Sequence, residues 1–113
     1  MANTHKLAPG VHKILEELRA GLEKLYGDEL EQIILYGSYA RGDARPPDSD
    51  LDVIAVITDY EDRWEELKRT SQLVSGLSLK HEVSVSLLLV RHAEWEKGEE
   101  LLYTNAREEG IAA

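Results

Sequence analysis

The hydrophobic residues of this chain follow two different spacings, and each spacing predicts one kind of secondary structure. Near the N-terminus they recur every three or four positions between charged residues. This spacing predicts an amphipathic helix of about four turns that starts near Pro9 and ends at Gly27. Its apolar positions are Val11, Ile14, Leu15, Leu18, Leu22 and Leu25. The same spacing returns from Tyr60 onward and predicts a second helix, for which Asp59 is the expected N-cap.

Three shorter apolar runs predict β-strands. Residues 32–36 and 51–57 are almost continuously apolar, which is typical of strands buried on both faces. Glu82 to Val90 begins instead with alternating polar and apolar residues, and it predicts a third strand. A strand as apolar as residues 53–57 belongs in the centre of a sheet. We therefore expect the first residues of that strand to open into a cleft at the sheet edge.

The helices after the second and third strands complete the pattern. In the helix from Tyr60, the apolar positions are Trp64, Leu67, Val74 and Leu77, and we expect this face to join the core. His92 to Ala106 predicts a last helix with Trp95 on its apolar side, and the regular pattern ends after it. Helices that alternate with strands predict an α/β fold with a small mixed sheet flanked by helices. We expect residues 1–113 to form a single domain.

Composition restricts the function more than the fold. The chain has no cysteine, which excludes disulfides and thiolate zinc sites and fits a cytoplasmic location. No apolar run is long enough to cross a membrane. Thirteen basic and 22 acidic residues give a formal net charge of −9. Since such a surface repels nucleic acid backbones, a nucleic acid partner is disfavoured, whereas a nucleotide whose phosphates are screened by Mg²⁺ is not.

The candidate chemistry lies where the first two predicted strands meet. Asp50 and Asp52 are two residues apart at the start of an apolar strand, so both side chains are expected on one face of it. Adjacent carboxylates repel each other unless a cation neutralises them, and carboxylate oxygens suit Mg²⁺. The Gly37-Ser38 pair just upstream offers backbone N–H groups and a hydroxyl, which is typical of a turn that binds phosphate. Together these features indicate metal-assisted nucleotide chemistry.

Two arginines lie between the Gly37-Ser38 turn and the two carboxylates. Either Arg41 or Arg45 could bind the charge of a triphosphate as a bidentate donor. Alternatively, they neutralise Asp43 and Asp48. The second interpretation is the simpler one for Arg45, whereas both stay open for Arg41.

A longer motif in this region resembles a known family. The string Gly37-Ser-Tyr-Ala-Arg-Gly-Asp, followed by Ser49-Asp-Leu-Asp, is similar to the signature of the DNA polymerase β-like nucleotidyltransferases. Within this superfamily it resembles the minimal, MNT-type branch, whose members are often encoded beside HEPN proteins as the antitoxin half of a toxin–antitoxin pair. The resemblance covers most of the chain and implies the nucleotidyltransferase fold, which is similar to the palm of polymerase β.

The resemblance also implies roles for particular residues. Gly37 and Ser38 would hold the β- and γ-phosphates of ATP, with Arg41 as a further candidate. Asp50 and Asp52 would hold two Mg²⁺ ions, which Mn²⁺ could replace. The family adds a third carboxylate from a neighbouring strand, and Glu82 is the candidate because it begins the third predicted strand. The alternative for Glu82 is a solvated loop residue.

The implied activity is the transfer of a nucleoside monophosphate, AMP from ATP, to a hydroxyl of a HEPN-type protein partner. The first alternative is a non-catalytic antitoxin that binds nucleotide and neutralises its partner by contact. The second is a nucleotidyltransferase that acts on a small molecule or on RNA 3′ ends. Because the chain leaves little room for an acceptor-binding domain of its own, we expect a protein partner, a homodimer or both.

Overall fold

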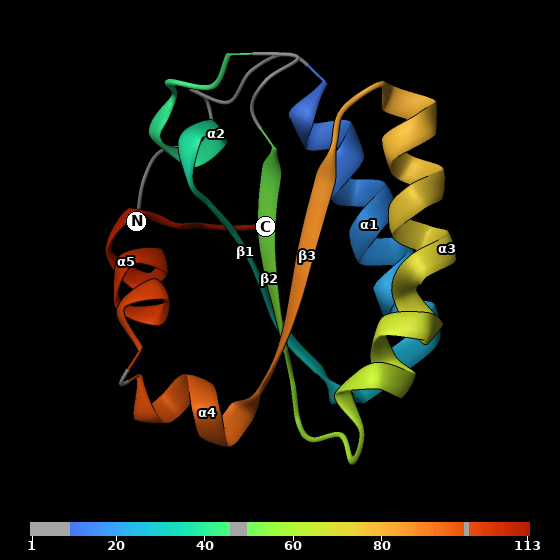
Figure 1. Ribbon diagram of the computed structural model, residues 1–113, viewed down its shortest axis with the longest axis vertical. Coiled ribbons are helices and arrows are strands. Elements are labelled where there is room, and N and C mark those ends of the chain that lie inside the picture. The colour runs from blue at the N-terminus through green and yellow to red at the C-terminus, as the bar shows by residue number, and fades with distance from the viewer. Residues whose placement is uncertain (1–9, 46–49, 99) are drawn as a thin grey trace.

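The computed structural model describes residues 10–45, 50–98 and 100–113, and this part of the chain forms a mixed β-sheet between two layers of helices (Figure 1). The strands are β1 (Leu30–Tyr36), β2 (Leu51–Ile57), β3 (Val85–Arg91) and β4 (Ile111–Ala112). Their order across the sheet is β3-β2-β1-β4. β2 is antiparallel to β1 and parallel to β3, and β4 is antiparallel to β1. β2, which the sequence predicted to be central, therefore lies between β3 and β1.

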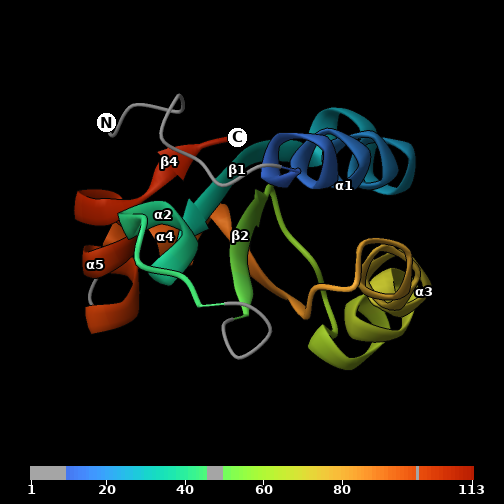
Figure 2. The same ribbon diagram turned by 90° about the horizontal axis from the view of Figure 1, so that it is seen from above.

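Helices cover both faces of the sheet. The elements are α1 (Val11–Tyr26), the 3₁₀ turn η2 (Gly27–Glu29), α2 (Ser38–Arg41), α3 (Arg63–His81), α4 (His92–Lys97) and α5 (Leu101–Glu109). α1 and α3 lie on one side, and α2, α4 and α5 lie on the other (Figure 2). The predicted α/β class with a small mixed sheet is confirmed. Among the described residues, no helix is long and apolar enough to span a membrane.

The side chains of β2 alternate between two hydrophobic clusters, one on each face of the sheet. Leu51, Val53, Ala55 and Ile57 belong to the cluster with α1 and α3. Ile54 and Val56 belong to the cluster with Trp95 and Tyr103 from α4 and α5. Each fully buried Leu, Ile or Val contributes roughly 1.5–3 kcal/mol, so this strand anchors both layers. Since Asp52 alternates in step with Ile54, it lies on the face of α4 and α5.

Three expectations for α3 need correction. Its N-cap is Asp62, whose side chain accepts a hydrogen bond from the backbone N–H of Trp64 at 3.0 Å, and not Asp59. Trp64 and Leu67 were expected in the core but are 64% and 54% exposed. The strand order explains this exposure: β3 is the edge strand beside α3, so none of the described strands or helices covers the outer side of the helix. Leu77, on the inner side, is buried as predicted.

The C-terminal part also differs from the prediction. The single helix expected over residues 92–106 is divided into α4 and α5 at Gly98, which has a positive φ of 59°. Trp95 of α4 is buried as predicted. Residues 111–112, where the pattern ended, add the short strand β4 to β1. The third strand begins at Val85, three residues later than expected, because α3 continues to His81.

Candidate active site at the start of β2

The site is built where β1 ends and β2 begins. Tyr36, the last residue of β1, is paired with Asp52 of β2 in the antiparallel register. Gly37 follows with φ 76° and ψ −156°, a conformation that is essentially restricted to glycine. A Cβ atom at Gly37 would come within 2.6 Å of Asp52 Oδ2. The glycine therefore lets the backbone turn lie directly against this carboxylate.

The turn that starts at Gly37 is closed by backbone hydrogen bonds. The N–H of Arg41 donates to the carbonyl of Gly37 at 3.0 Å, and the N–H groups of Gly42 and Asp43 both donate to the carbonyl of Ser38 at 3.0 Å. Ser38 begins the short helix α2 and is partly buried. Tyr39 is buried in the core below the turn, which fixes α2 against the sheet.

Asp50 and Asp52 lie close enough to influence each other. Asp52 is partly buried, whereas Asp50 is exposed just before the strand. Burial raises the pKa of Asp52, the negative charge of Asp50 raises it further, and the positive charge of Arg41 partly offsets both effects. These two carboxylates and one guanidinium form the electrostatic centre of the site. All three residues were candidates from the sequence.

Arg41 is held beside the carboxylates by two acidic side chains. Its Nε lies 3.3 Å from Asp43 Oδ2, and its Nη1 lies 3.4 Å from Glu109 Oε2 at the end of α5. Hydrogen bonds and charge from both carboxylates raise the pKa of Arg41. All three side chains are about half exposed, so solvent screens both ion pairs and keeps them weak. The predicted contact with Asp43 is present, whereas Asp48, the expected partner of Arg45, lies outside the described residues.

Glu82 is not brought to this site. It is the exposed C-cap of α3, in a left-handed conformation with φ 54°, and does not belong to β3. The β3 residue paired with Asp52 is Ser86, whose hydroxyl is a poor metal ligand. Within residues 10–45, 50–98 and 100–113, no three His, Cys, Asp or Glu side chains are grouped to hold a metal ion. The structure thus gathers two of the three predicted carboxylates.

Two residues near the site were missed or underestimated from the sequence. Tyr36 ends the run 32–36 that was expected to be buried on both faces, but it is only partly buried, and its pKa is raised by burial and by the charge of Asp52. The phenol therefore stays protonated beside the carboxylate. Glu109 reaches Arg41 from the far end of the chain. No local sequence signal could have indicated this contact, because it depends on how α5 returns to the sheet.

Known proteins resemble this chain in sequence and in fold. Residues 15–112 match the family described as the nucleotidyltransferase domain. A protein from Methanocaldococcus jannaschii, named as a candidate protein adenylyltransferase, is 29% identical over 79 residues, which are 70% of this chain and 78% of that protein.

Two solved structures are similar in fold. A toxin–antitoxin structure with AMP-PNP has a TM-score of 0.62 at 22% identity, over 89% of this chain and 69% of that chain. A complex of tri-AMPylated HEPN toxin with MNT antitoxin from Shewanella oneidensis has a TM-score of 0.53 at 21% identity, over 89% of this chain and 66% of that chain. The family match covers nearly the whole chain and includes every residue of the site. The chain therefore belongs to the nucleotidyltransferase domain family.

Proposed function

We propose that this nucleotidyltransferase transfers AMP from ATP to a hydroxyl of a HEPN-type partner protein and acts as the antitoxin of a toxin–antitoxin pair. The observation that carries the proposal is the carboxylate pair Asp50 and Asp52, of which Asp52 lies against the Gly37 turn. The adenylyltransferase name of the archaeal relative supports AMP as the transferred group. A similar fold is found in the complex of an AMPylated HEPN toxin with its MNT antitoxin, which supports the kind of acceptor.

The side chains at the site fit a magnesium–nucleotide complex. Mg²⁺ is commonly held by one or two carboxylates together with substrate phosphates, and Asp50 and Asp52 provide such a pair. In this role the metal would neutralise phosphate charge and favour loss of the acceptor proton, and Mn²⁺ could replace it. The second ion implied by the family resemblance would need a further ligand, because among the described residues no third carboxylate is grouped with the pair.

The protein residues would mainly bind and orient the nucleotide. The turn at Gly37 and Ser38 would present backbone N–H groups and a hydroxyl to the β- and γ-phosphates. Arg41 would add positive charge beside them, since its pairs with Asp43 and Glu109 are exposed and weak. In the transfer, the acceptor oxygen bonds to the α-phosphorus, the bond from this phosphorus to the α–β bridging oxygen breaks, and pyrophosphate leaves. The acceptor proton passes to solvent.

A second candidate function is favoured by one observation. Since the described residues provide only two of the three expected carboxylates, the protein could retain nucleotide binding and neutralise its partner by contact alone. An acceptor other than a protein is the remaining alternative. RNA 3′ ends are disfavoured by the net charge of −9, whereas a small molecule is not.

The test is to incubate the protein with ATP, Mg²⁺ and the HEPN-type protein encoded beside it, and to measure intact masses. We expect the partner to gain the mass of AMP. Asp50→Asn and Asp52→Asn should each lower the rate by ~10²–10⁴-fold, since several kcal/mol of charge stabilisation is lost. Asp59→Asn, at the other end of β2, is the matched control and should leave the rate unchanged. A stable complex without any mass change would favour the contact antitoxin. If the two proteins neither bind nor react, a protein acceptor is excluded.

The same assay decides the role of Glu82. If it moves into the site when nucleotide binds, Glu82→Gln should lower the rate by the ~10²–10⁴-fold typical of a lost catalytic carboxyl group. If it remains the cap of α3, the rate should stay within about twofold of wild type.

A further inference from the structure

The guanidinium of Arg41 pairs with two carboxylates of its own chain. Its Nε lies 3.3 Å from Asp43 Oδ2, and its Nη1 lies 3.4 Å from Glu109 Oε2. A bidentate contact with a phosphate uses two neighbouring nitrogens of the guanidinium, either Nε with Nη2 or Nη1 with Nη2. Each of these two edges therefore includes one nitrogen that pairs with a carboxylate. A phosphate that binds Arg41 in this way must displace one of the two acidic side chains.

The two carboxylates differ in how they are attached to the site. Asp43 belongs to the turn itself, since its backbone N–H donates to the carbonyl of Ser38 at 3.0 Å. Its contact is with Nε, so it leaves the edge formed by Nη1 and Nη2 to other groups. Glu109 comes from 68 residues further along the chain and contacts this second edge. It is therefore the side chain that a phosphate on the second edge of Arg41 would displace.

The pairing of β4 with β1 fixes the position of Glu109. The two strands are antiparallel, with Ile111 opposite Leu35, and this register, continued by two residues, places Glu109 at the level of Gly37. Gly110 lies directly against β1, where there is no room for a Cβ atom. The end of α5 lies on the same side of the sheet as α2 (Figure 2). The return of the last helix to the sheet thus brings a carboxylate to the phosphate turn.

The pair of Arg41 and Glu109 is weak enough for a triphosphate to replace it. Both side chains are 46% exposed, so water screens their attraction. A triphosphate carries several negative charges, and a phosphate forms strong charge-assisted hydrogen bonds with a guanidinium. Breaking the existing pair still opposes binding and lowers the observed affinity. Glu109 is like a phosphate in its negative charge and its acceptor oxygens, and it uses part of the same set of donors.

We propose that Glu109 competes with the nucleoside triphosphate for Arg41 and thereby lowers the affinity of the site for ATP. The inference rests on the proposed function, which assigns the triphosphate to the turn at Gly37. It also links nucleotide binding to the last helix, because α5 loses its contact with the turn when the triphosphate takes the second edge of Arg41. Since coupling between two sites is reciprocal, moving the end of α5 away from Arg41 should strengthen nucleotide binding.

The test is calorimetry of the purified chain with Mg²⁺ and tripolyphosphate, and then with Mg²⁺ and ATP. Glu109→Gln should lower both dissociation constants about two- to fivefold, the factor that corresponds to an exposed ion pair. The matched control is Glu108→Gln, which removes the same charge from an exposed side chain one residue earlier. This control should leave both constants close to those of the wild type.

Two further measurements separate competition from a structural role of Glu109. In the Arg41→Gln background, Glu109→Gln should change neither dissociation constant. In the AMP-transfer assay, Glu109→Gln should lower the KM for ATP and leave kcat within about twofold, because the contact with phosphate is made in the ground state and the transition state alike. If Glu109 only held α5 in place, its loss would instead destabilise the protein and weaken binding.

Three results would overturn the inference. They are unchanged or weaker binding in Glu109→Gln, an equal gain with and without Arg41, and a wild-type protein that binds neither tripolyphosphate nor ATP. The binding experiment needs neither a partner nor transfer, so it is separate from the test of the proposed function. AMP transfer with binding that does not depend on Glu109 would overturn this inference alone. Binding that depends on Glu109, without AMP transfer, would support the inference and contradict the proposed function.

Discussion

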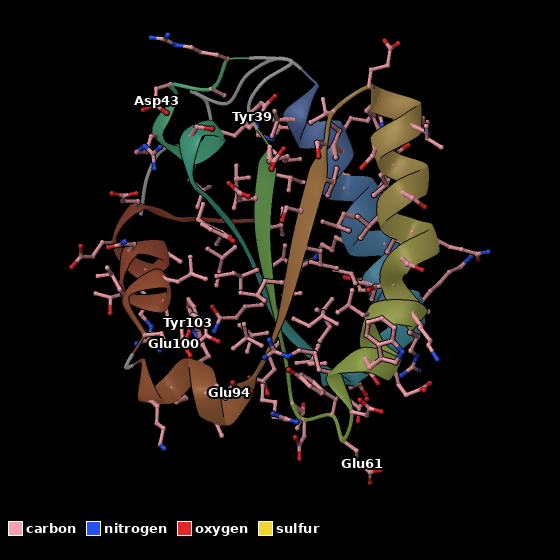
Figure 3. All side chains as sticks on the ribbon, in the orientation of Figure 1. Tyr39, Asp43, Glu61, Glu94, Glu100 and Tyr103 are labelled. Carbon is pink, nitrogen blue, oxygen red and sulfur yellow. The ribbon has the colours of Figure 1, made fainter. Side chains whose placement is uncertain are left out.

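Charged side chains lie at both ends of strands β2 and β3. At one end they form ion pairs with each other, and at the other end two carboxylates lie together. At the end where β2 stops, Arg91 Nε lies 3.2 Å from Asp59 Oδ1, and Arg91 Nη1 lies 3.1 Å from Glu94 Oε1. The guanidinium carbon of Arg91 also lies 4.1 Å from the centre of the Tyr60 ring. At the end where β2 starts, two carboxylates adjoin a glycine turn. Figure 3 shows the two ends, with Asp43 marking the site and Glu94 the opposite end.

The difference indicates which end binds a ligand. The charges around Arg91 satisfy each other within the chain, and Arg91 Nε also donates to the carbonyl of Tyr60 at 3.0 Å. Asp52, by contrast, has its pKa raised by burial and by Asp50, while Arg41, whose positive charge lowers it, is shared with two other carboxylates. Folding alone does not favour that arrangement. An external cation would complete it, as a magnesium–nucleotide complex does.

Among the variants that test this difference between the two ends, Gly37→Ala is expected to lose the most stability and turnover. The new Cβ would meet Asp52 Oδ2 at 2.6 Å in a backbone conformation that costs about 1–3 kcal/mol for any other residue. Moving this carboxylate by ~1 Å should reduce turnover by ~10²-fold. Chemical denaturation and the AMP-transfer assay measure the two losses separately.

Gly42→Ala is the matched control for that variant. Gly42 also has a positive φ, of 85°, but a Cβ there has no atom within 4 Å. It should lose ~1 kcal/mol of stability through backbone strain and keep most of the activity. If the two variants lost the same activity, the close contact between the turn and Asp52 would have no role in the site.

A smaller effect is expected from Arg91→Ala at the opposite end. The variant leaves Asp59 and Glu94 without their cation and removes the stacking on Tyr60, so the free energy of unfolding should fall by ~1–2 kcal/mol. Nucleotide binding, measured by calorimetry, should be unchanged. Lys68→Ala, on the exposed side of α3, is the control and should change stability by less than ~0.5 kcal/mol. Weaker nucleotide binding in Arg91→Ala would mean that the two ends are coupled.

The central part of the molecule could be predicted from the sequence because local pattern and tertiary environment agree there. Residues 51–57 form a strand with the predicted bounds, and every position except Asp52 is buried, as expected for a central strand. The Gly37 turn and the two aspartates follow from chemistry that does not depend on distant parts of the chain. The same is true of the first helix, whose apolar face matches α1.

Where packing between distant elements decides, the sequence was a poorer guide. Trp64 and Trp95 occupy similar positions in apolar helical patterns, but only Trp95 has a neighbouring element to cover it. Residues 82–84 continue the period-two pattern of β3, yet Glu82 is the C-cap of α3. A helix end and a strand start compete for such residues, and the alternation does not show which prevails. β4 is only two residues long and exists because β1 has a free edge beside it.

The smallest and most specific effect concerns the pKa of Asp52. Its pKa in the folded protein is higher than its ordinary value of 3.8, so the folded state binds this proton more tightly than the unfolded state. Stability therefore falls as the pH rises through the raised pKa, and the penalty is absent below 3.8. Glu17 acts in the opposite direction, since hydrogen bonds from Lys80 and His81 lower its pKa to about 2. Its stabilisation is present above 4.5 and lost as the pH falls toward 2.

Asp50 and Arg41 shift the pKa of Asp52 in opposite directions, and this leads to a paired experiment on the metal-free protein. Asp50→Asn removes the repelling charge and should lower the pKa of Asp52, whereas Arg41→Gln removes the attracting charge and should raise it. The carboxyl carbon shift of Asp52, followed by NMR during a pH titration, reports both changes directly. Asp59→Asn, at the neutralised end of β2, should leave the titration where it is in the wild type. Because Mg²⁺ competes with the proton at Asp52, metal binding should weaken on acidification at a higher pH in Arg41→Gln than in the wild type. If Asp52 titrated at the same pH in all four proteins, Asp50 and Arg41 would not act on it, and the carboxylate pair would not be one site.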